Sequence, residues 1–160
     1  MFEKISIHTP RQFVPANLNA GSWPTLEPLF DQLEGQLASA ADGAQLEQAI
    51  LNWEELSAAI AEESSRRYIA MTCQTDDKTA EQAHLDFIET IEPEEKQRSF
   101  RLAKALSEHP HRGGLPAKRY EVFTRDAALE VELFRPENVP LETETAKLAQ
   151  QYQKLIGGLA

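Results

Sequence analysis

The sequence has very little cysteine, no long apolar run and no excess of basic residues. Cys73 is its one cysteine among 160 residues, so neither a disulfide framework nor a cysteine-built metal cluster is expected. The longest wholly apolar run is a few residues, far short of the roughly 20 that span a bilayer. The first residues lack the charged-then-apolar layout of a secretory signal. A reducing cytoplasm is the compartment that these absences favour.

Acidic residues outnumber basic ones, with 26 Asp and Glu against 16 Lys and Arg and a net charge of −10. Such a field repels polyanions, so neither nucleic acid nor an anionic membrane surface is an expected partner. Hydrophobic residues make up 41% of the chain and charged residues 26%, which is typical of a globular protein. The length suits one domain.

The longest uninterrupted pattern runs from Leu46 to Thr75 and contains no Gly or Pro. Positions three and four residues apart form a stripe typical of one helix face. The stripe consists of Leu46, Ile50, Trp53, Ser57, Ile60, Tyr68 and Met71. At a rise of 1.5 Å per residue this helix would be about 45 Å long. Other long helices must therefore lie alongside it.

Residues 1–21 are predicted to form an extended arm, because two prolines prevent a continuous helix. The prolines are Pro10 and Pro15, and the alternating strand-like residues are Phe2, Ile5 and Ile7. We expect the arm to dock on the helices through Phe2, Phe13 and Val14.

A first helix is predicted to begin at Ser22 as its N-cap and to end at Asp42-Gly43. Pro24 then falls in the first turn, where a missing N–H is tolerated. Its apolar face consists of Leu26, Leu29, Phe30, Leu33 and Leu37.

After the long helix, Asp76 and Asp77 are predicted to cap a third helix, and a cation site is the less favoured alternative. The third helix carries His84, Phe87, Ile88 and Ile91 on one face. Pro93 then predicts either a kink or the start of a new helix.

The remaining helices are separated by prolines and glycines. One carries Phe100, Leu102, Ala103 and Leu106 and stops at His109-Pro110, before a loop at 111–114. A short helix with Tyr120 and Phe123 is predicted next, followed by another from about Asp126 that ends before Pro136 and packs Leu129, Val131, Leu133 and Phe134. The last helix follows the break at 138–140, and its stripe is Leu141, Thr145, Leu148, Tyr152, Leu155 and Leu159. Spacings of four and three predict lengthwise packing of this stripe.

These patterns predict an all-α fold, an elongated antiparallel bundle of long helices over residues 22–160 with the extended arm at 1–21. They contain no catalytic motif. A helical zinc peptidase site needs H-E-x-x-H, and none of the four histidines lies in that arrangement. Glu81-x-x-His84 is the nearest metal-like pair, but di-iron bundles need two such pairs. His84 is therefore interpreted as a partly buried bundle residue.

The other reactive residue types also have structural interpretations. His109 and His111 are expected to interact with a helix C-terminus, and Cys73 has no histidine nearby in the sequence. Gly113-Gly114 is too short to cradle a phosphate. Three acidic pairs are interpreted as solvated faces: Glu54-Glu55, Glu62-Glu63 and Glu94-Glu95. The residues alone therefore indicate no catalytic residue and no metal ligand, and they leave substrate-binding residues unassigned.

Four strings cover nearly the whole chain in order: PRQFVPANLNAGSWPTLEPLFDQL, WEELSAAIAEESSRRYIAMTCQTDD, FIETIEP and ELFRPENVPLETETAKLAQQYQKLIG. Together they resemble the N-terminal helical region of the oligoendopeptidase F and thimet oligopeptidase family of zinc metallopeptidases. The resemblance implies a mostly helical intracellular enzyme that cleaves short peptides in a deep channel. It also implies that these helices form part of one channel wall. The zinc site of that family lies several hundred residues further on, so the resemblance assigns no catalytic or metal residue here.

Two functions remain open. The first is an N-terminal domain of an oligoendopeptidase F-like zinc metalloendopeptidase, inactive alone, with zinc present only in the full-length family. The second is a free-standing helical interaction module without catalytic activity. In that case, the Leu148, Tyr152 and Leu155 face is expected to bind a partner or to mediate self-association.

Overall fold

The computed structural model describes residues 11–157. Within these residues the chain forms six α-helices and one short 3-10 helix, and it forms no strand. The elements are α1 (Trp23–Ser39), α2 (Gly43–Cys73), α3 (Lys78–Thr90), α4 (Glu92–Ser107), η1 (Arg112–Gly114), α5 (Ala117–Leu133) and α6 (Asn138–Gly157). The predicted all-α fold is confirmed. Five residues singled out above lie outside the described residues: Phe2, Ile5, Ile7, Pro10 and Leu159.

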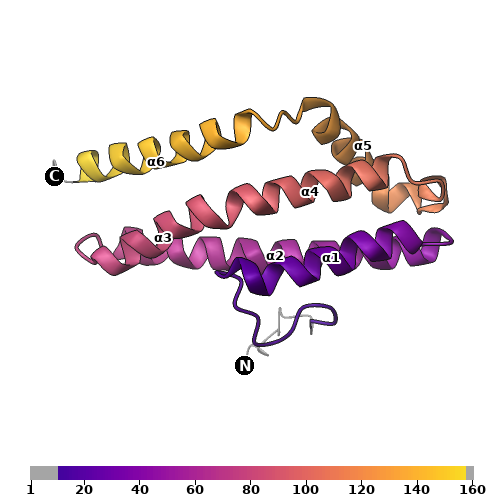
Figure 1. Ribbon diagram of the computed structural model, residues 1–160, viewed down its shortest axis with the longest axis horizontal. Coiled ribbons are helices and arrows are strands. Elements are labelled where there is room, and N and C mark those ends of the chain that lie inside the picture. The colour runs from indigo at the N-terminus through magenta and orange to yellow at the C-terminus, as the bar shows by residue number, and fades with distance from the viewer. Residues whose placement is uncertain (1–10, 158–160) are drawn as a thin grey trace, which may run out of the picture.

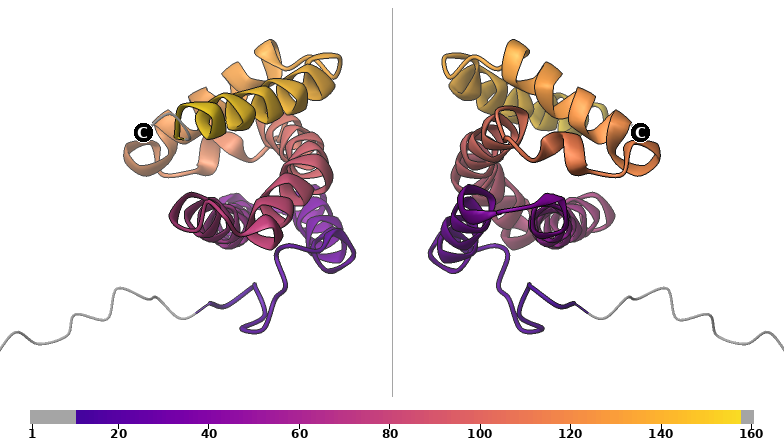
Figure 2. Two further views of the ribbon diagram at one scale, coloured as in Figure 1. Left: turned by 90° about the vertical axis from the view of Figure 1, so that its left-hand side faces the viewer. Right: turned by 90° about the vertical axis from the view of Figure 1, so that its right-hand side faces the viewer.

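The helices form an elongated assembly in which long elements lie side by side (Figure 1). α1 and α2 form an antiparallel hairpin, and α3 and α4 follow one another along nearly one line beside it. α6 runs back along α3 and α4, while α5 packs against α4 near one end of the molecule. Seen end-on, α4 lies between a layer that holds α1, α2 and α3 and a layer that holds α5 and α6 (Figure 2).

Local capping determines where α2 and α3 begin. The Asp42 carboxylate accepts a hydrogen bond from the Gln45 backbone N–H at 2.8 Å, so Asp42-Gly43 begins α2. The prediction that this pair ends the first helix is wrong, since α1 already ends at Ser39. Asp77 caps α3 through the backbone N–H groups of Thr79 and Ala80, as predicted.

Ser22 occupies the predicted N-cap position of α1, but its side chain makes no capping hydrogen bond. Instead, the Thr25 hydroxyl donates to the Ser22 carbonyl oxygen at 2.7 Å. Near the other end of the hairpin, a Cβ added at Gly43 would lie 2.8 Å from the Gly114 carbonyl oxygen. Glycine at the start of α2 therefore lets the backbone of η1 pack directly against it.

Most prolines of the described chain lie in the first turn of a helix or between helices, although Pro28 lies inside α1. α3 ends at Thr90 and α4 begins at Glu92 with Pro93 in its first turn, so the new-helix alternative is the observed one. α5 is one helix, and the prediction of two helices here is wrong because no Gly or Pro interrupts residues 117–133. α6 begins at Asn138, three residues before the predicted start, and includes Pro140 in its first turn.

The apolar core lies between α1, α2 and α4, with contributions from the neighbouring helices. Trp53 is buried, as predicted. Leu56 is fully buried while Ser57 is half-buried, so the core face of α2 is offset from the predicted stripe by one residue at this point. Tyr68 is 44% exposed, which contradicts its predicted core position. The reason is length: α2 has 31 residues and α1 only 17, so much of the C-terminal half of α2 has no α1 beside it.

The arm docks on α2 through residues that the sequence identified. Val14 is buried and Phe13 is half-buried against the core. The Glu55 carboxylate holds this segment by accepting the backbone N–H groups of both residues, at 2.8 Å from Val14 and 3.1 Å from Phe13. Residues 11–21 contain no helix. The division into an arm and a bundle stays a prediction, because residues 1–10 lie outside the described part.

The predicted packing face of α6 is wrong. Its leucines and tyrosine are exposed to solvent by 63–71% at Leu141, Leu148, Tyr152 and Leu155. α6 packs on α3 and α4 through a different face, whose covered positions are Val139, Thr143, Ala146, Lys147 and Gln150. The most regular apolar stripe in the sequence thus points away from the rest of the described chain.

Candidate functional site

Two adjoining cavities form a cleft beside α4. The first has a volume of about 550 Å³ and lies between α2, α4 and the start of α6. The second, of about 350 Å³, lies between α2, α4 and α5. Both are lined by Ser57 of α2 and by Glu95 and Lys96 of α4. We name the two cavities together the α4 cleft.

Apolar side chains make much of the wall of the α4 cleft. Ile60, Phe87 and Val139 line the first cavity. Trp53 and Phe123 line the second, where their rings meet edge to face with centroids 5.7 Å apart. Such a mixture of apolar walls and a few polar groups is typical of binding sites in proteins.

Carboxylates make up much of the polar lining of the cleft, and two of them, Glu92 and Glu95, lie on α4. Desolvation raises the pKa of Glu95, while the hydrogen bond that the Ser99 hydroxyl donates at 2.8 Å and the charge of Lys96 act in the opposite direction. Desolvation also raises the pKa of Glu92, and the neighbouring charge of Glu95 raises it further. Both effects disfavour the ionised form, so these two side chains are held in an environment that opposes their charge.

Glu130 of α5 faces the same cleft from the other side. Its pKa is raised by desolvation first and then by the charge of Glu95. Lys96 is the cation nearest to this group of carboxylates in the cleft lining, and it is also ion-paired with Glu142 of α6. The cleft can therefore accept hydrogen bonds and positive charge, and it offers apolar contact beside them.

The described residues contain no group of three or more potential ligands placed to hold a metal ion. The two cavities that form the cleft are lined by no histidine or cysteine. A general base or nucleophile of either type is thus missing from the cleft. Its carboxylates and apolar walls suit the binding of a ligand.

The structure separates the pair Glu81 and His84. His84 is buried beside the Tyr68 ring, with centroids 5.7 Å apart, and its Nδ1 atom has no hydrogen-bond partner. Desolvation, followed by the charge of Arg67, lowers the pKa of His84 and favours the neutral ring. These facts agree with the interpretation of His84 as a bundle residue.

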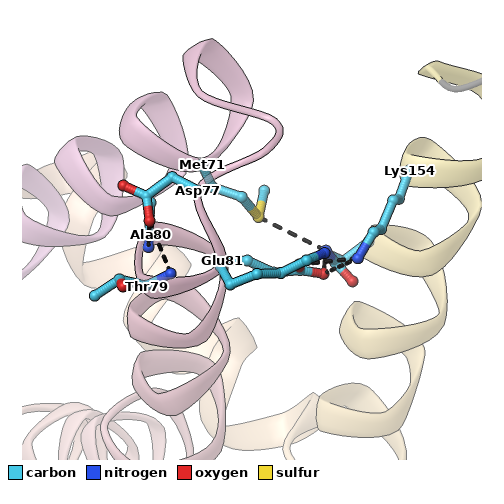
Figure 3. Close-up of polar contacts among 8 residues, drawn as sticks. Met71, Asp77, Thr79, Ala80, Glu81 and Lys154 are labelled. Carbon is cyan, nitrogen blue, oxygen red and sulfur yellow. Dashed lines mark hydrogen bonds and ion pairs between the residues drawn. The ribbon is translucent and has the colours of Figure 1, made fainter.

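Glu81 instead points toward α6 (Figure 3). Its carboxylate accepts hydrogen bonds from Lys154 at 2.7 Å and from Gln150 at 3.1 Å. A third bond comes from Lys78, one turn earlier on α3, at 3.1 Å. These donors, Lys154 first, lower the pKa of Glu81 to about 2. Glu81 is therefore a fixed negative charge that connects α3 to α6.

His109 directly follows the end of α4, as expected, and its ring also contacts the end of α1. Its Nε2 atom is 3.1 Å from the carbonyl oxygen of Leu37, in the last turn of α1, while its Nδ1 accepts the His111 backbone N–H at 3.2 Å. A neutral ring protonated on Nε2 satisfies both contacts. Cys73 is exposed at the end of α2.

Three members of the acidic pairs are not on solvated faces. Glu55 anchors the arm, Glu63 is half-buried and pairs with Arg67, and Glu95 is half-buried in the α4 cleft. The sequence signal for the cleft was present in part, because Glu92, Glu95 and Lys96 share one face of α4 by helical spacing. The apposed walls on α5 and α6 could not be predicted, since they depend on how those helices turn back after Pro116 and Pro136.

Comparison with known proteins gives one match. The family model described as Peptidase M3 N-terminal domain matches residues 13–134, more than half of the chain and the whole of α1 to α5. No curated protein and no solved structure matches the chain. Among the described residues, no helix is long and apolar enough to cross a membrane.

Proposed function

The chain belongs to the peptidase M3 N-terminal domain family, and from this premise we propose that it is the N-terminal domain of an oligoendopeptidase F-like zinc metalloendopeptidase. In this proposal the helices form part of the wall of a channel that admits short peptides, in a cytoplasmic enzyme. The zinc ion and the bond-breaking residues belong to another part of that enzyme. By itself the chain is inactive.

The observation that carries this proposal is the family match over residues 13–134. Support comes from the α4 cleft, whose carboxylates and apolar walls suit a peptide with basic or amide groups beside apolar side chains.

The coding sequence downstream of residue 160 tests directly whether the chain is one domain of a longer peptidase. We expect an in-frame continuation that encodes H-E-x-x-H, the helical motif that holds catalytic zinc in peptidases. A stop codon directly after residue 160, confirmed in the mRNA, would overturn the proposal that the chain is one domain of a peptidase.

A second candidate function is a helical interaction module, and the exposed stripe on α6 favours it. Leu148 and Tyr152 are both 63% exposed and Leu155 is 71% exposed. Apolar faces of this kind promote association with a partner or with a second copy. Light scattering over a concentration series separates the two candidates, because a strict monomer at every concentration contradicts self-association through this face.

A further inference from the structure

α6 is attached to the rest of the described chain mainly by charge. Val139 is the only apolar residue of α6 that is buried, and no residue of α6 belongs to the main core cluster. By contrast, α1 buries Leu26, Phe30, Leu33 and Leu37 in that cluster. Apolar burial is the larger source of stability in most helix packing. Apolar contacts therefore contribute little to holding α6 against the other helices.

Three ion pairs connect α6 to the α3–α4 line instead. Lys154 pairs with Glu81 at 2.7 Å, and Lys147 pairs with Glu89 at 2.9 Å. Glu142 pairs with Lys96 at the far end. The pairs follow one another along two antiparallel elements, roughly two turns apart on α3 and α4. Figure 3 shows the first of these contacts, at the end of α6 near the α2–α3 turn.

Gln150 makes a further polar contact at the end of α6 that lies near the α2–α3 turn. Gln150 is buried, and its side-chain amide donates to Glu81 and lies 3.8 Å from the Met71 sulfur. All three ion pairs contain side chains that are 31–50% exposed, namely Lys147, Lys154, Lys96, Glu89 and Glu142. Exposed pairs of this kind are weakened by salt.

The segment between α5 and α6 can act as a pivot. α5 ends at Leu133, and Phe134 has an extended backbone. The Phe134 ring stacks on Phe100 of α4 with centroids 4.1 Å apart, so the near end of the segment is fixed to α4. Pro136 follows and prevents a continuous helix into α6.

We propose that α6 is a hinged strap that closes the α4 cleft and is held shut by these three ion pairs. Val139, Glu142 and Thr143 of α6 line the first cavity, so movement of α6 about residues 134–137 opens that side of the cleft. The core of α1 to α5 stays folded during this movement, because no residue of α6 belongs to the main core cluster. The strap therefore responds to ionic strength and to any ligand that competes for the paired lysines or glutamates.

Distance measurement between two spin labels tests this proposal on the full chain. One label is attached to Cys73, which is exposed at the end of α2, and the other to a cysteine introduced by Gln153→Cys. Gln153 lies with Met71 and Thr72 around one small cavity, so the two labels start close together. At low salt we expect one short, narrow distance distribution.

Two changes are expected to lengthen and broaden that distribution. One is 1 M NaCl, where the screening length falls to about 3 Å. The other is Lys147→Gln together with Lys154→Gln at low salt. The matched control is Arg66→Gln with Arg125→Gln, which removes the same charge from side chains that are 71% exposed and pair only within their own helices. The control is expected to leave the distance unchanged.

Tryptophan emission supplies the second readout, because Trp53 lies in the α1–α2 part of the core and Trp23 packs against it. We expect it to stay unchanged while the label distance grows. A distance that stays short in both salt and the lysine variant would overturn the proposal. So would a distance that grows only together with a loss of folded tryptophan emission, since α6 would then be an inseparable part of the core.

Discussion

Trp53 connects the core to the α4 cleft, because its ring is 7% exposed and also lines the second cavity. Truncation to alanine removes this contact and leaves a cavity. We predict that Trp53→Ala lowers the free energy of unfolding by about 3–5 kcal/mol, measured by urea denaturation.

The control for that variant is Ile69→Ala on the same helix, where the side chain is 57% exposed. It is expected to change stability by less than about 0.5 kcal/mol. Equal effects from the two variants would show that the buried face of α2 is not the one described above.

Burial of the ionised Glu95 carboxylate costs the folded state free energy, and the packing of the helices does not explain why a carboxylate stands at this position. Its pKa is raised by desolvation, so the folded state holds its proton more tightly than the unfolded state. Below the unfolded pKa both states are protonated and the group contributes nothing. Above the raised folded pKa both are ionised, and the folded state bears the desolvation cost. We predict that Glu95→Gln raises Tm at neutral pH and that the gain shrinks as pH falls through this interval.

Thermal melts over an acidic-to-neutral pH series measure this effect. Glu94→Gln is the matched control, because Glu94 is the exposed neighbour on α4. A fall of Tm at neutral pH in the Glu95 variant would mean that the carboxylate stabilises the fold. The predicted rise would fit a residue kept for binding, since charged groups with perturbed pKa cluster at functional sites.

Among the helices, α1 and α4 are connected by a largely buried arginine as well as by the apolar core. Arg98 of α4 is 12% exposed and contacts Asp31 at 2.7 Å and Glu34 at 2.9 Å on α1. Hydrogen bonds to charged groups contribute more than neutral ones, so we predict that Arg98→Ala destabilises the chain by about 1–3 kcal/mol in urea denaturation.

Arg101 provides a comparison on the same helix. It is 59% exposed and lies 4.0 Å from Glu34. Arg101→Ala removes the same charge and is expected to cost less than about 1 kcal/mol. If the two variants are equally destabilising, the Arg98 contacts do not join the helices as described.

Most helices could be predicted from the sequence, because their signals are local. The Asp77 cap and the break at Pro93 involve only neighbouring backbone groups, so no tertiary information was needed. The apolar stripe on α6, which faces solvent, shows where prediction from local signals fails. Leu148 and Tyr152 have the spacing of a packed helix face, yet packing depends on which neighbour is present and on how the chain turns at Pro136.

The candidate site was harder to predict than the fold. Helical spacing places Glu92, Glu95 and Lys96 on one face, but it cannot tell a solvated face from a cleft wall. That difference arises from α5 and α6, which approach from residues far along the sequence. Glu55 was missed for the same reason, since its partners are backbone groups of the arm.

On the scale of the whole molecule, the described chain combines a well-buried helical core with a cleft lined by carboxylates and apolar side chains. The family match covers the core helices α1 to α5, while α6 lies beyond it. The proposed wall domain of a peptidase would account for these features together. It needs a stable scaffold, a surface that contacts peptide, and an apolar face for other parts of the enzyme.

Hydrolysis of a fluorogenic peptide tests this account most directly. The purified 160-residue chain is incubated with the peptide and zinc, with and without a chelator, beside an authentic zinc endopeptidase as positive control. The account predicts no hydrolysis above the buffer rate in either condition. Hydrolysis that scales with the concentration of the chain and is abolished by the chelator would contradict it, because bond cleavage would then reside in these residues.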